Sequence, residues 1–147
     1  MNMTPRQRVR LLTSGIQQDL LCYTELLQLL LRQHRLLATH DVEGLTEHNQ
    51  QQTRLMAQVQ QQAQQRCQHL LALGLRPDEK GMAILIAKLP TSLQQHATNQ
   101  WQELEQLLQQ CLRQNDLNGR LLAGQIETIN TLLGQGQGYG QLEHFSD

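Results

Sequence analysis

The sequence is poor in aromatic residues, proline and charge, and each shortage excludes a class of protein. Aromatics make up 3% of the 147 residues, with one Trp, one Phe and two Tyr, which is too little to line a cofactor pocket with rings. Three prolines and few Val or Ile residues argue against a β-sandwich or an α/β fold. Charged residues make up 17% and the formal net charge is -1, so the chain lacks the basic field of a nucleic-acid-binding protein.

Cysteine and long apolar runs are scarce as well. The three cysteines, Cys22, Cys67 and Cys111, are odd in number and widely spaced, which suits free thiols in a reducing compartment. The Leu-rich run over residues 26–31 contains Gln28 and is closed by Arg32, so it is too short for a membrane span or a secretion signal. We therefore expect a cytoplasmic protein that does not insert into a membrane.

Leucine and glutamine dominate the composition. The chain holds 30 Leu and 27 Gln, so two good helix formers account for 57 of its 147 residues. Leu supplies apolar helix faces, and Gln keeps the opposite faces soluble with little charge. The composition predicts an all-α fold, which we expect to be an antiparallel bundle of three long helices plus one short helix with coiled-coil-like packing.

The first long helix has a clear start and a regular apolar pattern. Thr4 and Pro5 predict its N-terminus, because a Thr hydroxyl caps free N–H groups and Pro has no N–H to leave unpaired. Apolar residues then recur at steps of three and four to about residue 38. Extra Leu residues widen this face beyond a two-stranded seam, which favours a bundle of three or more helices.

The second long helix and the short helix are bounded by turn residues. Asp41 is predicted to cap the second helix and Gly74 to end it. Polar residues such as His48 fall where the repeat calls for apolar ones, so we expect the first half of this helix to be loosely packed or partly exposed. The short helix is predicted over residues 79–89, with Pro90 closing it.

The last helix is predicted to be the longest. A capping box of Thr91 and Gln94 starts it, and its apolar pattern continues to Leu133. Asn118-Gly119 is a common turn pair, so a break there is the alternative. Unbroken, this helix spans roughly 65 Å, against roughly 51 and 48 Å for the first two. Its C-terminal part should extend past its neighbours and leave an apolar face uncovered, which is either ordinary core or a partner site.

Two regions are expected along the chain. Residues 1–134 are predicted to form the helical bundle. Residues 135–147 follow as a Gly-rich tail, which we expect to be flexible because it has too few apolar residues to order itself.

Catalytic and metal-binding patterns are missing from the sequence. The six His residues contain no pair spaced four residues apart, and no Cys lies near a His at a zinc-finger spacing. The Gly-rich tail lacks the Lys of a phosphate-binding loop. We expect no enzyme activity, no metal and no cofactor.

Residues 115–122, Asn-Asp-Leu-Asn-Gly-Arg-Leu-Leu, follow a helix that contains Trp101 and resemble the Asn-x-x-Asn-Gly-x-Leu-Ile signature of the FlgN family of flagellar export chaperones. Leu122 stands where Ile is common in that signature. The order of the other elements, two long helices joined through residues 41–45 and a Leu-rich stretch over residues 70–74, is similar to that family too. The resemblance covers about residues 10–135.

The resemblance implies a cytosolic chaperone that binds the C-terminal amphipathic helix of hook-associated (hook–filament junction) proteins. Such a chaperone prevents premature assembly of its clients and delivers them to the flagellar type III export apparatus, with the export gate or the ATPase complex as a further partner. Tyr139 in the tail is the candidate contact with the export gate. The predicted client-binding residues are Leu117, Asn118, Leu121, Leu122, Ile126, Ile129, Leu132 and Leu133.

Two other functions remain open from the sequence. A structural coiled-coil adaptor would self-associate through its long seams, as a homodimer or larger oligomer, and would have no export client. A nucleic-acid-binding bundle would use the five Arg residues of the first 40 positions, but the low net charge disfavours it.

Overall fold

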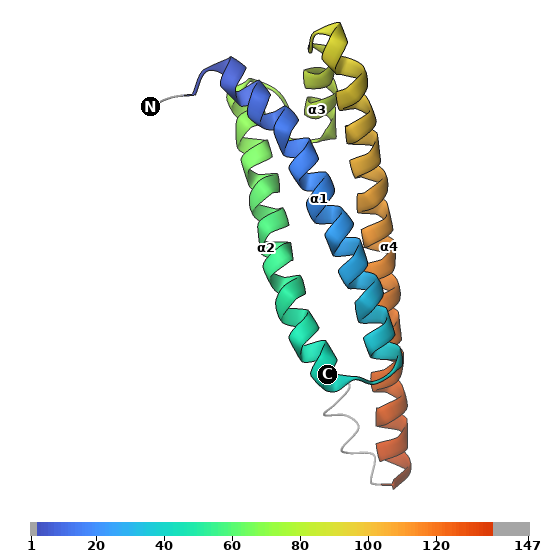
Figure 1. Cartoon of the computed structure of the whole chain (residues 1–147). Coiled ribbons are helices and arrows are strands. Elements are labelled where there is room, and N and C mark those ends of the chain that lie inside the picture. The colour runs from blue at the N-terminus through green and yellow to red at the C-terminus, as the bar shows by residue number, and fades with distance from the viewer. Residues whose placement is uncertain (1–2, 137–147) are drawn as a thin grey trace.

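The computed structural model describes residues 3–136, which fold into four helices (Figure 1). α1 (Pro5–Ala38) and α2 (Val42–Ala72) form an antiparallel hairpin, the short α3 (Glu79–Ala87) follows, and α4 (Thr91–Gly136) is the longest helix. The predicted set of three long helices and one short helix is thereby confirmed. α4 runs through Asn118 and Gly119 without a break, so the helix is continuous at that turn pair.

The caps of α1 and α2 are those that the sequence predicts. The Thr4 hydroxyl accepts a hydrogen bond from the N–H of Gln7 at 3.2 Å, and the Gln7 side chain accepts one from the N–H of Thr4 at 2.9 Å. Asp41 accepts from the N–H of Gly44 at 2.9 Å at the start of α2. Both caps satisfy N–H groups that have no partner inside the first helical turn.

The start of α4 differs from the prediction. Thr91 is already inside the helix rather than capping it, so the predicted capping box is wrong. The Gln94 side-chain amide instead donates to the carbonyls of Ala87 at 2.6 Å and Leu89 at 2.9 Å. These carbonyls at the end of α3 lack helical partners, and satisfying them ties α4 to α3.

Two glycines shape the connection from α2 to α3. Gly74 has a φ of 75°, and the N–H of Leu75 donates to the Leu70 carbonyl at 2.9 Å, which is the Schellman arrangement that ends a helix. At Gly81, a Cβ atom would collide with the backbone carbonyl of Arg76. The connecting chain therefore lies directly against α3, an approach that only glycine permits.

α1 lies between α2 and α4 and contacts both along its length (Figure 1). It runs antiparallel to α2 and parallel to α4. Three hydrogen bonds between α1 and α4 join residues that are 88 positions apart, at steps of seven residues, as in a parallel coiled coil. The three pairs are Tyr23 with Cys111, Leu30 with Asn118, and Leu37 with Gln125.

The largest apolar core lies at the end of the bundle where α3 packs. There Met82 and Leu85 of α3 meet Leu70 of α2, and Leu70 and Met82 are fully buried. α1 and α4 complete this cluster with Leu12, Ile16 and Leu104. A second cluster, midway along the bundle, joins α1 and α2 to Cys111 of α4.

A partly buried ion pair connects the three long helices. Arg66 of α2 donates to the Asp19 carboxylate of α1 at 2.6 Å, and its guanidinium lies 5.7 Å from the ring centroid of Trp101 on α4. Burial raises the pKa of Asp19 and outweighs the opposite effect of Arg66. Trp101 is half-buried and packs against two apolar clusters, so it contributes to the core.

Most residues in the first half of α2 are exposed, as predicted, and His48 is an exception. His48 is completely buried, and its Nε2 hydrogen-bonds to the Gln52 side chain at 3.2 Å. Gln52, one helical turn away, satisfies Nε2, whereas Nδ1 of His48 is buried without a hydrogen-bond partner among the described residues. The expectation of loose packing is therefore wrong at His48.

The predicted boundary between bundle and tail falls near the end of α4. The helix continues to Gly136, two residues beyond the predicted last residue of the bundle. The rest of the predicted tail, residues 137–147, lies outside the described residues, and its flexibility stays a prediction.

Candidate functional site

α4 extends beyond the end of α1. The carbonyl of Leu37, in the last turn of α1, accepts a hydrogen bond from the Gln125 side chain at 2.8 Å. Residues 126–136 of α4 continue past this contact over roughly 16 Å at 1.5 Å per residue. Figure 1 shows this segment, in red, projecting below the turn that joins α1 to α2. We call residues 126–136 the overhang, and it agrees with the length difference expected from the sequence.

The overhang carries an exposed apolar surface. Ile126, Ile129 and Leu132 expose 47%, 55% and 63% of their surface, and Leu122 and Leu133 expose 45% and 38%. Their spacing of three and four residues places them along one side of the helix. We call these five residues the C-terminal stripe.

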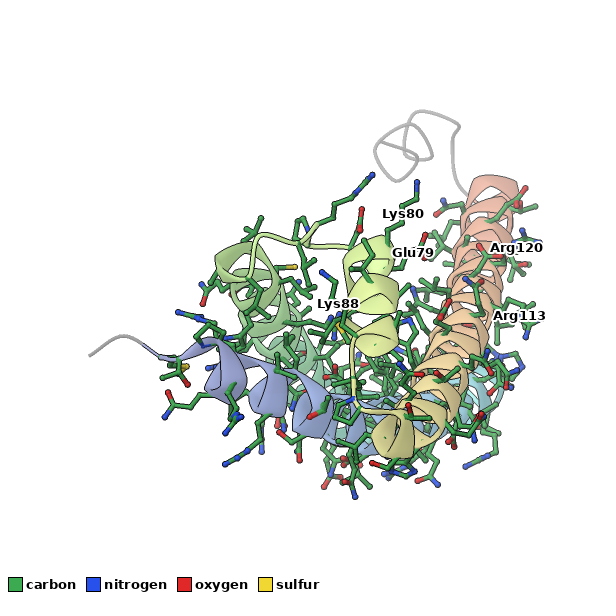
Figure 2. The ribbon with its side chains drawn as sticks, turned by 90° about the horizontal axis from the view of Figure 1, so that it is seen from above. Glu79, Lys80, Lys88, Arg113 and Arg120 are labelled. Atoms are coloured by element: carbon green, nitrogen blue, oxygen red, sulfur yellow. The ribbon has the colours of Figure 1, made fainter. Side chains whose placement is uncertain are left out.

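The C-terminal stripe has few charges around it. Glu127 is the only charged residue between positions 121 and 134. The nearest ion pair, Arg120 with Asp116 at 3.0 Å, is exposed, and Figure 2 shows Arg120 pointing away from the bundle. A partner at this surface would therefore be held by apolar burial and shape rather than by charge pairing.

Asn118 fixes α4 against α1 directly before the stripe. Its side chain is buried, and its Nδ2 donates to the Leu30 carbonyl at 2.8 Å and to Oε1 of Gln33 at 3.0 Å. Its Oδ1 accepts from Gln114 at 3.0 Å and lies 3.0 Å from Nδ1 of His34. A fully bonded amide in a coiled-coil seam specifies register, so Asn118 determines where along α1 the stripe begins.

The predicted client-binding residues do not all share one exposed face. Asn118 faces α1, so it positions the stripe and does not present its amide to a partner. Leu121 is half-buried. Leu117 is exposed, but nine residues separate it from Ile126, which places the two on opposite sides of the helix. Tyr139 lies outside the described residues.

Two glutamines at this end were missed by the sequence analysis. Gln33 extends the Asn118 contacts to α2 by donating to the Asn49 side chain at 3.3 Å. Gln125 follows Asn118 by seven residues, and the next position at that spacing is Leu132, which is exposed because α1 has ended. The seven-residue spacing could have identified Gln125, but one Gln among 27 does not stand out.

Within residues 3–136, no group of three or more His, Cys, Asp or Glu side chains could hold a metal ion. Burial raises the pKa of the Cys111 thiol, which disfavours the reactive thiolate. Over the same residues, no helix has the length and apolar character needed to cross a bilayer.

Comparison with known proteins assigns the chain to a family. The family model of the FlgN protein matches residues 3–137, which is nearly the whole chain. No curated protein and no solved structure matches it significantly.

Proposed function

The chain belongs to the FlgN family of flagellar export chaperones, and on that premise we propose that it binds the C-terminal amphipathic helix of hook-associated proteins. The family match over residues 3–137 confirms the predicted resemblance to this family. In this proposal the chaperone holds its client in the cytoplasm before export and delivers it to the type III export apparatus. Contact between Tyr139 and the export gate stays a prediction.

The C-terminal stripe is the observation that carries the proposal. Its five Leu and Ile side chains line one side of the end of α4, and the four from Ile126 onward lie past the last hydrogen bond with α1 among the described residues. Burying one such side chain completely contributes about 1.5–3 kcal/mol, so a partner helix that covers several of them gains substantial affinity. An amphipathic helix with apolar residues at every third or fourth position has the matching pattern.

The position of the stripe also explains how binding serves export. The C-terminal helix of a junction protein takes part in assembly, and leaving it exposed in the cytoplasm favours premature polymerisation. Covering that helix on the overhang removes its apolar face from water and from other subunits. The rest of the client is then free to remain unfolded for export.

Calorimetry with a synthetic C-terminal peptide of a hook-associated protein tests the proposal. Replacing Ile126 and Ile129 by Asp should weaken binding by at least about 2 kcal/mol, or about 30-fold in Kd, because two apolar anchors become charged. The matched control is Leu21→Asp with Leu71→Asp, which changes two exposed leucines on α1 and α2 in the same way. An equal loss in both double variants would contradict the proposal.

A truncation gives a second test with the bundle intact. Ending the chain after Gln125 removes the overhang and the tail but keeps the hydrogen bonds from Asn118 and Gln125 to α1. The truncated protein should keep its helical signal and lose peptide binding. Unchanged affinity would place the client site elsewhere on the molecule.

Self-association through the same stripe is the competing function. It predicts an oligomer at micromolar concentration that the Asp substitutions at Ile126 and Ile129 dissociate. Light scattering measures whether the oligomer forms and whether the Asp substitutions dissociate it. Peptide binding distinguishes the two functions, because a client chaperone binds the peptide whether or not it forms a homodimer, whereas an adaptor does not bind it.

A further inference from the structure

An apolar groove lies at the opposite end of the molecule from the overhang. It has a volume of about 610 Å³ and runs between residues 6–17 of α1 and residues 89–100, which include the start of α4. Val9, Leu89, Leu93 and Ala97 are the apolar side chains among its walls, together with Pro90. Leu89 and Ala97 are buried and Val9 is half-buried, whereas Leu93 is 53% exposed, so Leu93 is the apolar side chain that lacks a cover among the described residues.

The dimensions of the groove match a short helix. Each wall extends over eleven residue steps, which is about 16 Å or three helical turns. The lining positions on α1 recur at steps of three and four, so they form one face of that helix. The groove lies on one side of this end of the α1–α4 pair, and α3 covers the other side. There Met82 and Leu85 of α3 pack against Leu12 and Leu104. One more helix in the groove would cover the open side in the same way.

The charge around the groove has one sign. Arg6, Arg10 and His96 line it together with uncharged residues, and no Asp or Glu does. Within residues 3–136, neither arginine forms an ion pair. α1 and α4 run parallel, so both helix N-termini lie at this end, and neither carries an acidic residue in its first turn. The helix dipoles therefore add to the positive potential of the arginines.

Segments of this chain are poor candidates to fill the groove. The tail, residues 137–147, spans at most about 37 Å when extended, whereas residues 100–136 of α4 separate it from the groove by about 54 Å. A symmetric contact with a second copy would bring Arg6 and Arg10 against the same residues of that copy, and like charges oppose such a contact.

We propose that this groove docks an acidic amphipathic helix of about three turns from a partner protein. Its apolar residues would cover Leu93 and the exposed part of Val9, and its carboxylates would face Arg6 and Arg10. The site lies roughly 40 Å along α4 from the C-terminal stripe, so one chaperone has room for this partner and a client at the same time. The proposal does not depend on the client assignment.

Fluorescence anisotropy with two designed peptides tests this inference on the full-length protein. Both peptides have about 16 residues and Leu at every third or fourth position, with Glu at the other positions in one and Lys in the other. The Glu peptide should bind at least about tenfold more tightly than the Lys peptide. Arg6→Glu with Arg10→Glu should remove that preference, and Leu93→Asp should weaken binding of the Glu peptide at least about tenfold.

Arg113→Glu with Arg120→Glu is the matched charge control. Both arginines lie on α4 and point away from the bundle in Figure 2, so the affinity for the Glu peptide should change less than about twofold. The client peptide should bind the Arg6 and Arg10 double variant as tightly as the wild type, which separates this groove from the stripe.

Four results would overturn the inference. The first is equal affinity for the two peptides, and the second is an equal loss of affinity for the Glu peptide in the control variant. The third is concentration-dependent self-association that Arg6→Glu with Arg10→Glu abolishes. The fourth is binding to anionic vesicles or RNA that the same variant abolishes, in a protein that does not bind the Glu peptide. Circular dichroism verifies the fold of each variant, and Arg6 and Arg10 are exposed, so the charge reversal should leave the melting temperature nearly unchanged.

Discussion

The two ends of the α1–α4 pair keep one register but are held by different contacts. Near α3, Leu12, Ile16 and Leu104 are buried together with Leu70 and Met82 from the neighbouring helices. Toward the other end, the contacts are hydrogen bonds from Asn118 and Gln125 to backbone carbonyls of α1. Beyond Cys111, Asn118 is the only buried residue in the described part of α4.

This difference shows how one helix serves both as core and as binding surface. Apolar burial stabilises the end near α3, whereas directional hydrogen bonds fix the position of the other end without burying the Leu and Ile residues at the end of α4 from Leu122 onward. Those residues remain at the surface as the C-terminal stripe. A segment with few buried apolar contacts is also expected to open more easily than the core.

Leu70→Ala should have the largest effect on stability. Leu70 is completely buried where α1, α2, α3 and α4 meet, so the cavity should lower the free energy of unfolding by about 2–5 kcal/mol. Chemical denaturation measures this loss. Leu71→Ala, at an exposed neighbour, should change the free energy by less than about 0.5 kcal/mol. If both variants lower the free energy of unfolding by the same small amount, the end near α3 is not the stable core.

Asn118→Ala should have a smaller and more local effect. The substitution leaves buried partners on α1 unbonded, which costs about 1–3 kcal/mol. Hydrogen exchange should accelerate in residues 112–136 and stay unchanged around Leu104. Asn115→Ala, at an exposed residue three positions earlier, is the control. Uniform acceleration along α4 would mean that the two ends are not independently stabilised.

The sequence was sufficient to predict the helices but not all of the contacts between them. Thr4, Asp41 and Gly74 mark helix ends by local chemistry, and local chemistry can be read from one chain. The role of Gln94 depends on the end of α3 lying within reach, and the role of Gln125 depends on where α1 ends. Such contacts are tertiary, so no local pattern predicts them.

The candidate site also has features that the sequence predicts and features that it does not. Helix lengths predicted the overhang, because 1.5 Å per residue holds for any helix. The orientation of Asn118 depends on the register of α4 against α1, which the Asn-Gly pair alone does not reveal. The groove between α1 and α4 depends on their parallel arrangement and was not predicted.

Replacing glycine by alanine should change the stability of the protein in opposite directions at the two ends of the bundle. At Gly119, an added Cβ meets no atom within 4 Å, so Gly119→Ala should stabilise the protein by about 1 kcal/mol through helix propensity. At Gly81, the Cβ would strike the Arg76 carbonyl, so Gly81→Ala should be destabilising by about 1–3 kcal/mol. Thermal unfolding of both variants measures the signs, and an increase in melting temperature for Gly81→Ala would contradict the packing described for α3.

The smallest expected effect is a pH dependence from Asp19. Burial raises the folded-state pKa of Asp19 above its ordinary value of 3.8, although Arg66 lowers it in part. Its contribution to stability is therefore fully present below that ordinary pKa and is lost as the pH rises through the folded-state pKa. Asp19→Asn cannot ionise, so its free energy of unfolding should rise relative to wild type as the pH increases above 3.8.

Chemical denaturation at several pH values measures this difference. Glu25→Gln removes an exposed carboxylate from the same helix and controls for net charge. If the Asn variant instead loses stability relative to wild type as the pH rises, the ion pair with Arg66 outweighs burial.

Hydrogen exchange of the full-length protein with and without a client C-terminal peptide tests the central claim most directly. Binding to the C-terminal stripe should slow exchange of the α4 amides over residues 117–136, because covering the overhang restrains a helix end that α1 does not support. Amides near Leu12, Leu70 and Leu104 should be unaffected. Slowed exchange elsewhere, with residues 117–136 unchanged, would contradict the account.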